Sequence, residues 1–460
     1  MSRPTPTTPG DRPVGRAPVP AAAAAAPTVH GYPRQGRRRE LKRALERHWS
    51  GALDAAGLLG VAADLRRERW QTLAAAGITE VPVGDPLYDH VLDLTVMLGA
   101  LPDRYVAAGA DADDPAAAAL ARSFAAARGT AELAPLELTK WFDTNYHYLV
   151  PELGRSTRFR LDPAALLNQV AQAQELGLSP RPVLLGPYSY LRLAKPDPAG
   201  SGTPLDLLDP LTDVYADLLG RLASAGVEWV QLDEPVAVTG LDPAGLDALA
   251  GTYRRLSAVT GRPRLLVAGY FDRLGEALEP LVASGIDGLG VDLTGRGAAD
   301  LDRLAGEHAP SGLAGLRLVA GVVDGRNVWR TDLDQALGVL ERLAPRVGRL
   351  DVAPSCSLIH VPIDVGLETG LDPELRGWLA FADQKLAEVA LLARGLREGR
   401  EAVTDELGAA RRARRPPHVA ADPGAGRPGA DRGGDAGPDG APGAGRRPGR
   451  AAAHRARAAP

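Results

Sequence analysis

Short apolar runs recur through the middle of the chain, and each is followed by a polar or turn residue and then by a helical pattern. An apolar run bounded by turn residues predicts a buried strand, and apolar residues at three- and four-residue spacing predict an amphipathic helix. The predicted strands are Val29–Pro33, Leu136–Phe142, Val183–Leu185, Trp229–Leu232, Leu265–Gly269, Leu289–Asp292, Leu318–Val323 and Leu350–Ala353. Helical spacing covers stretches such as Pro163–Leu176, Pro210–Ala225, Gly240–Val259 and Thr331–Leu343.

Eight predicted strands that alternate with helices indicate an α/β fold, a (β/α)8 barrel of the TIM type. A mostly helical insertion, from Arg39 to about Arg128, follows the first strand, and the barrel is expected to cover residues 29–400. In such barrels, binding and catalytic residues come from the C-terminal ends of the strands. Those ends carry Arg34, Lys140 with Asp143, Pro187, Asp233 with Glu234, Tyr270, Asp292, Asp324 and Ser355.

The two ends of the chain lack this pattern. Residues 1–28 contain an alanine run between prolines, which indicates a disordered, low-complexity start rather than a secretion signal. Residues 401–460 are expected to finish a helix and then to be disordered, because from Arg411 onward there is no Leu, Ile, Phe, Tyr or Trp to bury. A gene read out of frame explains this tail most simply, and a basic arm for acidic partners is the alternative.

Bulk properties exclude several functional classes. The net charge of −4 gives no indication of a nucleic-acid partner. The single cysteine, Cys356, excludes a disulfide framework and a zinc site made of several thiolates, and it fits a reducing, cytoplasmic location. An apolar run of about 18 residues, which a membrane-spanning helix needs, does not occur, so no membrane partner is expected.

Two cationic segments suggest an anionic ligand. Arg39 and Lys42 share one face of a predicted helix, and several cations near a strand end suit a ligand with several carboxylates or phosphates. The stretch Glu137–Tyr148 combines a lysine, a tryptophan, two carboxylates, an amide and a histidine, which is typical of a binding loop. Its Lys140 would point into the barrel and require an anion. The alternatives are a solvated charged face for the first segment and, for the second, a structural ion pair of Lys140 with Asp143 or with a carboxylate of the rim.

Two further clusters allow a catalytic or a structural interpretation. Asp233 and Glu234 could act as an acid and a base, although consecutive strand residues point to opposite faces. Hydrogen bonding to neighbouring loops is the structural alternative for this pair. Cys356 lies four residues from His360, a spacing that invites a nucleophile or a metal ligand, but a buried and inert cysteine is the favoured interpretation.

Several segments resemble, in order, the cobalamin-independent methionine synthase family. They are Gly31–Lys42 (GYPRQGRRRELK), Leu87–Asp93 (LYDHVLD), Thr139–Tyr148 (TKWFDTNYHY), Arg181–Gly186, Trp229–Pro235, Gly321–Thr331 (GVVDGRNVWRT), Val352–His360 (VAPSCSLIH) and Trp378–Lys385 (WLAFADQK). The resemblance covers residues 29 to about 410. It implies a family of two (β/α)8 barrels that transfers a methyl group from 5-methyltetrahydropteroyltriglutamate to homocysteine. It also implies that the N-terminal barrel helps to bind the folate polyglutamate tail, with substrate-binding positions at Arg39, Glu40, Leu41, Lys42 and Lys140.

The departures from the family pattern shape the expected function. In the family, a histidine, two cysteines and a glutamate of the second barrel hold zinc, and nothing similar follows residue 410 here. We therefore expect an N-terminal barrel cut short by a frameshift, with no catalytic residue and no bound zinc, which reaches homocysteine only through the missing barrel and is inactive alone. The alternatives are a stand-alone folate-binding or trans-acting support module and an autonomous barrel hydrolase that uses Asp233 or Glu234.

Overall fold

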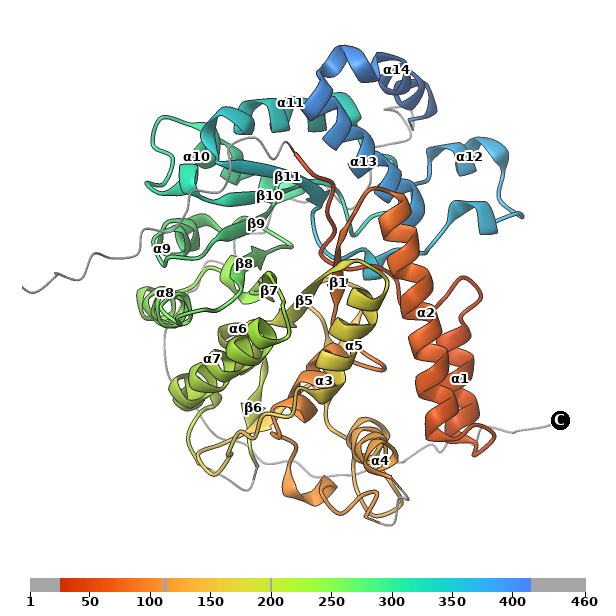
Figure 1. The fold of residues 1–460 in the computed structure, drawn as a ribbon, viewed down its shortest axis with the longest axis vertical. Helices are drawn as coiled ribbons and strands as arrows, with labels where there is room; N and C mark the ends of the chain where they lie inside the picture. Colours follow the sequence, from red (N-terminus) through yellow and green to blue (C-terminus); the bar gives the residue numbers. More distant parts are fainter. Residues whose placement is uncertain (1–24, 111–113, 199–200, 415–460) are drawn as a thin grey trace, which may run out of the picture. The chain divides into compact units, whose positions relative to one another are not determined.

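Seven parallel strands form one curved sheet at the centre of the protein (Figure 1). The structure is a computed structural model, and it describes residues 25–110, 114–198 and 201–414. The sheet order is β1-β5-β7-β8-β9-β10-β11. The strands are β1 (Glu80–Val83), β5 (Ser179–Leu185), β7 (Trp229–Asp233), β8 (Arg264–Gly269), β9 (Gly288–Asp292), β10 (Arg317–Val323) and β11 (Arg349–Pro354).

A short segment near the start of the described chain takes the remaining barrel position. The backbone N–H of Thr28 donates to the carbonyl of Val352 at 2.9 Å, and that of Val352 donates to the carbonyl of Ala26 at 3.0 Å. This pairing with β11 is parallel and centres on Pro27. The fold is therefore TIM-like, as predicted, although its first position is occupied slightly earlier than the predicted strand Val29–Pro33.

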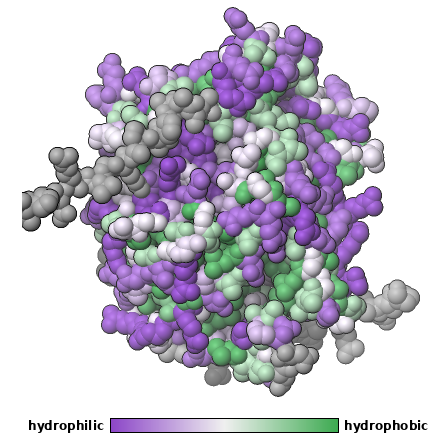
Figure 2. All heavy atoms as spheres, viewed as in Figure 1, coloured by the Kyte–Doolittle hydropathy of each residue, from purple (hydrophilic) through white to green (hydrophobic). Residues whose placement is uncertain are grey.

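Helices surround the sheet and bury its outer face (Figure 1). They are α1 (Glu40–Trp49), α2 (Ala55–Ala75), α3 (His90–Met97), α4 (Pro115–Arg128), α5 (Ala164–Glu175), α6 (Pro187–Leu193), α7 (Leu208–Ser224), α8 (Pro243–Ser257), α9 (Leu278–Val282), α10 (Asp300–Ala305), α11 (Leu333–Leu343), α12 (Pro373–Trp378), α13 (Ala382–Glu398) and α14 (Thr404–Ala413). Every residue of β7, β9 and β10 is buried, as expected for strands covered on both faces. On the side shown in Figure 2, hydrophilic residues cover most of the surface. Among the described helices, none is both long and apolar enough to span a membrane.

The prediction of the second barrel strand was wrong. Leu136–Phe142 contains β2 (Leu138–Lys140), which pairs with β3 (His147–Leu149) as an antiparallel hairpin outside the barrel sheet. The true barrel strand is β1, which lies inside the predicted helical insertion. With four residues and a central proline, β1 gives a weak strand signal. Lys140 is consequently exposed on the hairpin and does not point into the barrel.

The insertion is divided in two by β1. Helices α1 and α2 precede it, whereas α3, α4 and the β2–β3 hairpin connect it to β5, together with β4 (Glu152–Leu153), which pairs with β6 (Lys195–Pro196). Leu41 and Leu45 of α1, Leu58 of α2 and Phe124 of α4 share a buried cluster separate from the main core. This packing fixes α1, and with it the first predicted binding segment, beside the barrel.

Buried ion pairs fill the N-terminal end of the barrel. Arg181 and Arg317 are each 1% exposed, and both donate to Glu80, at 2.6 and 2.9 Å. Arg317 also donates to Asp351 at 2.6 Å. Burial opposes ionisation of Glu80, but the two guanidinium groups outweigh it and hold the pKa of Glu80 below its usual value. This end of a TIM-type barrel contributes stability rather than chemistry.

Candidate functional site

The C-terminal strand ends form the mouth of the barrel and collect most of the predicted rim residues. Barrel elements contribute Arg34, Pro187, Asp233, Glu234, Tyr270, Asp292, Asp324 and Ser355, whereas Lys140 and Asp143 come from the hairpin. Asp89 and His90 also belong to the mouth, and sequence analysis missed them as rim residues because it missed β1. The LYDHVLD motif was the available signal, since it follows β1 directly.

The tip of the β2–β3 hairpin lies over this mouth. Arg34 Nη2 donates to the Tyr146 hydroxyl at 2.9 Å and to the Tyr88 carbonyl at 2.5 Å. The Tyr146 ring has its centroid 5.8 Å from that of His90 and 6.2 Å from that of His360. Tyr146 therefore contacts residues from three barrel loops, and the hairpin is attached to the barrel at its tip.

A second group of contacts joins the hairpin tip to the opposite side of the mouth. The rings of Phe142 and Phe271 lie 5.4 Å apart, and both residues have positive φ, at 51° and 85°. Non-glycine residues rarely adopt this conformation, and it concentrates at functional sites. Arg326 lies over the Phe271 ring at 5.3 Å and forms an ion pair with Asp143 at 2.6 Å.

The predicted segment Arg39–Lys42 has a distinct geometry at the start of α1. Arg39 adopts a left-handed conformation with φ 61° and is exposed. Glu40 turns back to accept a hydrogen bond from the Arg38 N–H at 2.9 Å. Leu41 is only 3% exposed and packs in the cluster shared by α1, α2 and α4, and its N–H donates to the Gln35 carbonyl at 3.1 Å. Lys42 is exposed and lies 3.8 Å from Glu46, an ion pair of little strength.

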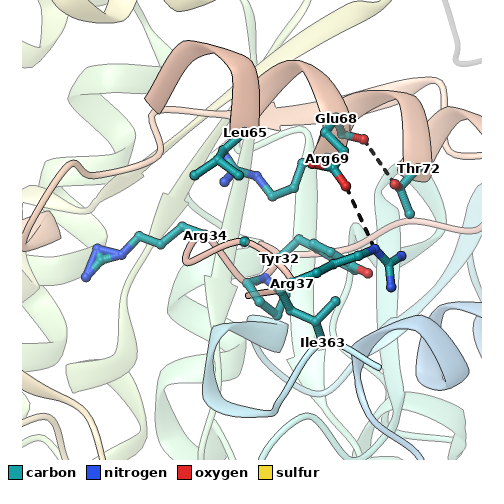
Figure 3. Close-up of a pocket in the computed structure, with 10 residues that line it drawn as sticks. Tyr32, Arg34, Arg37, Leu65, Glu68, Arg69, Thr72 and Ile363 are labelled. Carbon is teal, nitrogen blue, oxygen red and sulfur yellow. Dashed lines mark hydrogen bonds and ion pairs between the residues drawn. The ribbon is translucent and has the colours of Figure 1, made fainter. Parts of the chain in front are cut away.

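Arg37 anchors the loop that leads to this segment. It forms ion pairs with Asp383 at 2.8 Å and Asp364 at 3.2 Å, and the Tyr32 hydroxyl also donates to Asp383. The hydrogen bond to Asp383 raises the pKa of Arg37. A cavity of about 20 Å³ beside it has room for roughly one water molecule. Figure 3 shows Arg34 extending away from Arg37 and Ile363. Its guanidinium donates to the Tyr146 hydroxyl, outside this view.

Lys140 is free for a ligand. It is exposed on β2 opposite His147 of β3, and within the described residues its ammonium group makes no hydrogen bond or ion pair. The alternative pairing with Asp143 is absent, because Asp143 contacts Arg326 instead. The segments that carry Arg39 and Lys140 are linked through the Arg34–Tyr146 hydrogen bond.

Asp233 and Glu234 have structural partners on all sides. Glu234 is fully buried and accepts hydrogen bonds from the N–H groups of Tyr188 and Ser189, at 3.2 and 2.7 Å, and from the Tyr253 hydroxyl at 2.8 Å. Gln231 and Tyr270 donate to Asp233 at 2.6 and 3.0 Å. Burial raises the pKa of both carboxyl groups to about 7. Glu234 thus holds the first turn of α6 against the barrel, which favours the structural interpretation.

The residues that the structure describes do not fit a zinc site. Cys356 is 1% exposed, and burial raises the pKa of its thiol well above the usual value, so the thiolate needed for zinc is disfavoured. The His360 ring faces Tyr146 and Phe271, and burial lowers its pKa to about 4. Nowhere in residues 25–110, 114–198 and 201–414 do three or more His, Cys, Asp or Glu side chains gather to hold a metal.

Fold and mouth together define a TIM-like α/β barrel with a hairpin over its C-terminal end and exposed cations beside it. Residues 26–348 match the family described as "Cobalamin-independent synthase, N-terminal domain". The chain belongs to this family, as the sequence motifs predicted.

Curated relatives and solved structures agree with this assignment. The chain is 55% identical to a 5-methyltetrahydropteroyltriglutamate–homocysteine methyltransferase of Streptomyces coelicolor, over 85% of this chain and 50% of that protein. The corresponding protein of Mycobacterium tuberculosis is 48% identical, over 84% and 49%. The chain thus spans about half the length of these relatives. A B12-independent methionine synthase from a Shewanella species shares the fold, with a TM-score of 0.52 and 15% identity over 78% of this chain and 92% of that one.

Proposed function

We propose that this chain is the N-terminal, folate-tail-binding barrel of a cobalamin-independent methionine synthase, which transfers a methyl group from 5-methyltetrahydropteroyltriglutamate to homocysteine. The curated relatives carry both substrates in their names. The observation that supports tail binding most directly is Lys140, an exposed lysine without a partner among the described residues, on a hairpin linked to the loop of Arg39.

The chemistry of the tail suits these residues. A triglutamate tail carries several carboxylates along a flexible chain. Arg39 offers a guanidinium fork, and Lys42 and Lys140 offer point charges that accept varied carboxylate geometries. Glu40 would contribute through the backbone at the start of α1, because its carboxylate is engaged by the Arg38 N–H. Leu41 would contribute by fixing α1, because its side chain is buried and its N–H donates to the Gln35 carbonyl.

The chain alone is not expected to transfer the methyl group. Homocysteine sulfur attacks as a thiolate, and zinc is the Lewis acid that would hold it in this form near neutral pH. The chain has one cysteine, which is buried, and the part of the chain that the structure describes contains no group of three or more metal-ligating side chains. Purified chain mixed with 5-methyltetrahydropteroyltriglutamate, homocysteine and zinc should form no methionine. Zinc-dependent methionine formation by this chain would contradict the proposal.

Variants at the cations test tail binding. Lys140→Ala and Lys42→Ala should each weaken binding of the triglutamate folate roughly two- to fivefold, the effect of losing one exposed charge interaction. Arg342→Ala is a matched control, because Arg342 is an exposed arginine of α11 whose ion-pair partner, Asp302, lies on α10. An unchanged affinity in both lysine variants would exclude these residues from the site. It would then favour the alternative of a support module for a separate zinc-bearing barrel.

A further inference from the structure

Arg326 is presented at the barrel mouth by a rigid loop. Asp324, directly after β10, accepts hydrogen bonds from the N–H groups of Arg326 at 2.8 Å and Asn327 at 3.1 Å. Its other oxygen accepts from the Asn327 side chain at 2.7 Å, and the Gly325 N–H donates to Ser355 at 3.1 Å. The loop backbone is thereby fixed before any ligand arrives, which is what a binding residue at a strand end requires.

The partner of Arg326 is held much less firmly. The Asp143 side chain is 69% exposed at the hairpin tip, whereas that of Arg326 is 31% exposed. Asp143 follows Phe142, whose left-handed φ makes the tip conformation unfavourable by itself. Among the described residues, Arg326 is the one group to which the Asp143 carboxylate is bonded. A carboxylate on such a tip can leave without disturbing the barrel.

The surroundings of Arg326 favour an anion at this position. The guanidinium lies over the Phe271 ring at 5.3 Å, a contact that holds it beside the hairpin tip, where its Nη1 donates to Asp143. The Asp292 carboxylate accepts hydrogen bonds from the N–H and hydroxyl of Thr294 and from the N–H of Phe271, so both of its oxygens already have donors. Burial lowers the pKa of neighbouring His360 to about 4, so this imidazole is neutral near pH 7 and adds no charge beside the guanidinium.

We infer that Arg326 is a carboxylate-binding position of the barrel mouth, that Asp143 occupies it in the absence of ligand, and that a carboxylate of the ligand exchanges with Asp143. The nature of the ligand, a glutamate carboxylate of the folate tail, rests on the proposed function. Exchange is feasible because the Asp143 carboxylate is 69% exposed, so water already solvates it in the ion pair and a ligand carboxylate competes on nearly equal terms.

Asp143→Asn tests the exchange. The amide removes the competing charge and keeps the shape of the tip, so the triglutamate folate should bind roughly two- to fivefold more tightly to this variant than to the wild type. The gain should vanish when Arg326→Ala is added, because the exchange position itself is then absent. Asp302→Asn is the matched control, since it breaks another exposed arginine–aspartate ion pair, at 2.8 Å on the outer helices. Thermal unfolding of each variant confirms that it is folded.

An unchanged or weaker affinity for both the triglutamate folate and citrate in a folded Asp143→Asn variant would overturn the inference, because Asp143 would then only hold the hairpin. Citrate separates this inference from the proposed function. If wild type does not distinguish folates by tail length, the proposed function fails. A tighter binding of citrate by Asp143→Asn, lost with Arg326→Ala, would still support the exchange position. If the Asp143→Asn substitution changes neither the citrate affinity nor the folate affinity, the inference fails, whatever the dependence of folate binding on tail length.

Discussion

The Arg34 guanidinium lies 2.9 Å from the Tyr146 hydroxyl, and this hydrogen bond joins two segments that are more than one hundred residues apart in the chain. One segment leads to Arg39 and Lys42, and the other follows Lys140. Arg34 is 7% exposed, so its partners are hard to replace by water. The relative position of the proposed tail-binding cations therefore depends on this contact.

Tyr146→Phe should weaken tail binding and destabilise the protein by roughly 1.5–3 kcal/mol, because one hydrogen bond to a buried charged group is lost. Tyr148→Phe is the matched control, since its hydroxyl does not bond to Arg34 and donates to the Leu193 carbonyl at 3.0 Å instead. We expect Tyr148→Phe to lose about 1 kcal/mol in urea unfolding and only Tyr146→Phe to lose affinity. Equal affinities would show that the Arg34 contact does not position the site.

Arg39→Gly should raise stability while it lowers tail affinity. Arg39 is exposed and holds a left-handed φ of 61° that glycine adopts freely, so we expect a gain of about 1 kcal/mol in the free energy of unfolding. Arg38→Gly, at the neighbouring exposed residue without positive φ, should give no gain. A loss of stability in Arg39→Gly would mean that the arginine side chain supports the fold rather than a ligand.

Glu80→Gln tests the ion pairs at the opposite end of the barrel. It leaves two buried arginines, Arg181 and Arg317, without their shared carboxylate, which should lower the free energy of unfolding by roughly 3–5 kcal/mol. The measurement is the urea concentration at the unfolding midpoint, compared between proteins whose free energy of unfolding falls with urea at the same slope. A change below about 1 kcal/mol would show that water or Asp351 compensates.

The raised pKa of Glu234 predicts how the stability of the protein changes with pH. Burial raises its folded-state pKa to about 7 from a usual value of 4.5, so the folded protein binds this proton more tightly than the unfolded chain. Its contribution to stability is fully present below about pH 4.5 and is lost as pH rises through about 7. Relative to wild type, Glu234→Gln should therefore gain roughly 3 kcal/mol between these limits. Parallel pH profiles for the two proteins would contradict the raised pKa.

Much of the barrel could be predicted from sequence because its strands are continuous apolar runs, as in β8 and β10, whose burial on both faces leaves a local signal. Strand β1 lacked that signal because Pro82 interrupts a four-residue strand. The hairpin was mistaken for a barrel strand because Leu136–Phe142 has strand-forming residues, although Leu138 is 60% exposed. A local sequence pattern does not show whether a strand pairs within the barrel sheet or in a separate hairpin.

The candidate site shows the same division. Its residue types could be predicted, since Arg34, Asp233 and Asp324 follow recognisable strands and Cys356 is buried as expected. The contacts that organise it, Arg34 with Tyr146 and Asp143 with Arg326, span 112 and 183 residues and leave no local trace. The alternative of an ion pair between Lys140 and Asp143 rested on sequence proximity, and Asp143 pairs with the distant Arg326 instead.

The tail-length dependence of folate binding tests the central claim most directly. The affinities of 5-methyltetrahydropteroylmonoglutamate and -triglutamate for the purified chain should be measured at low and high salt. The triglutamate form should bind at least several-fold more tightly at low salt, and this preference should shrink at high salt, where exposed charge interactions are screened. Equal affinity for the two forms at low salt would contradict the account.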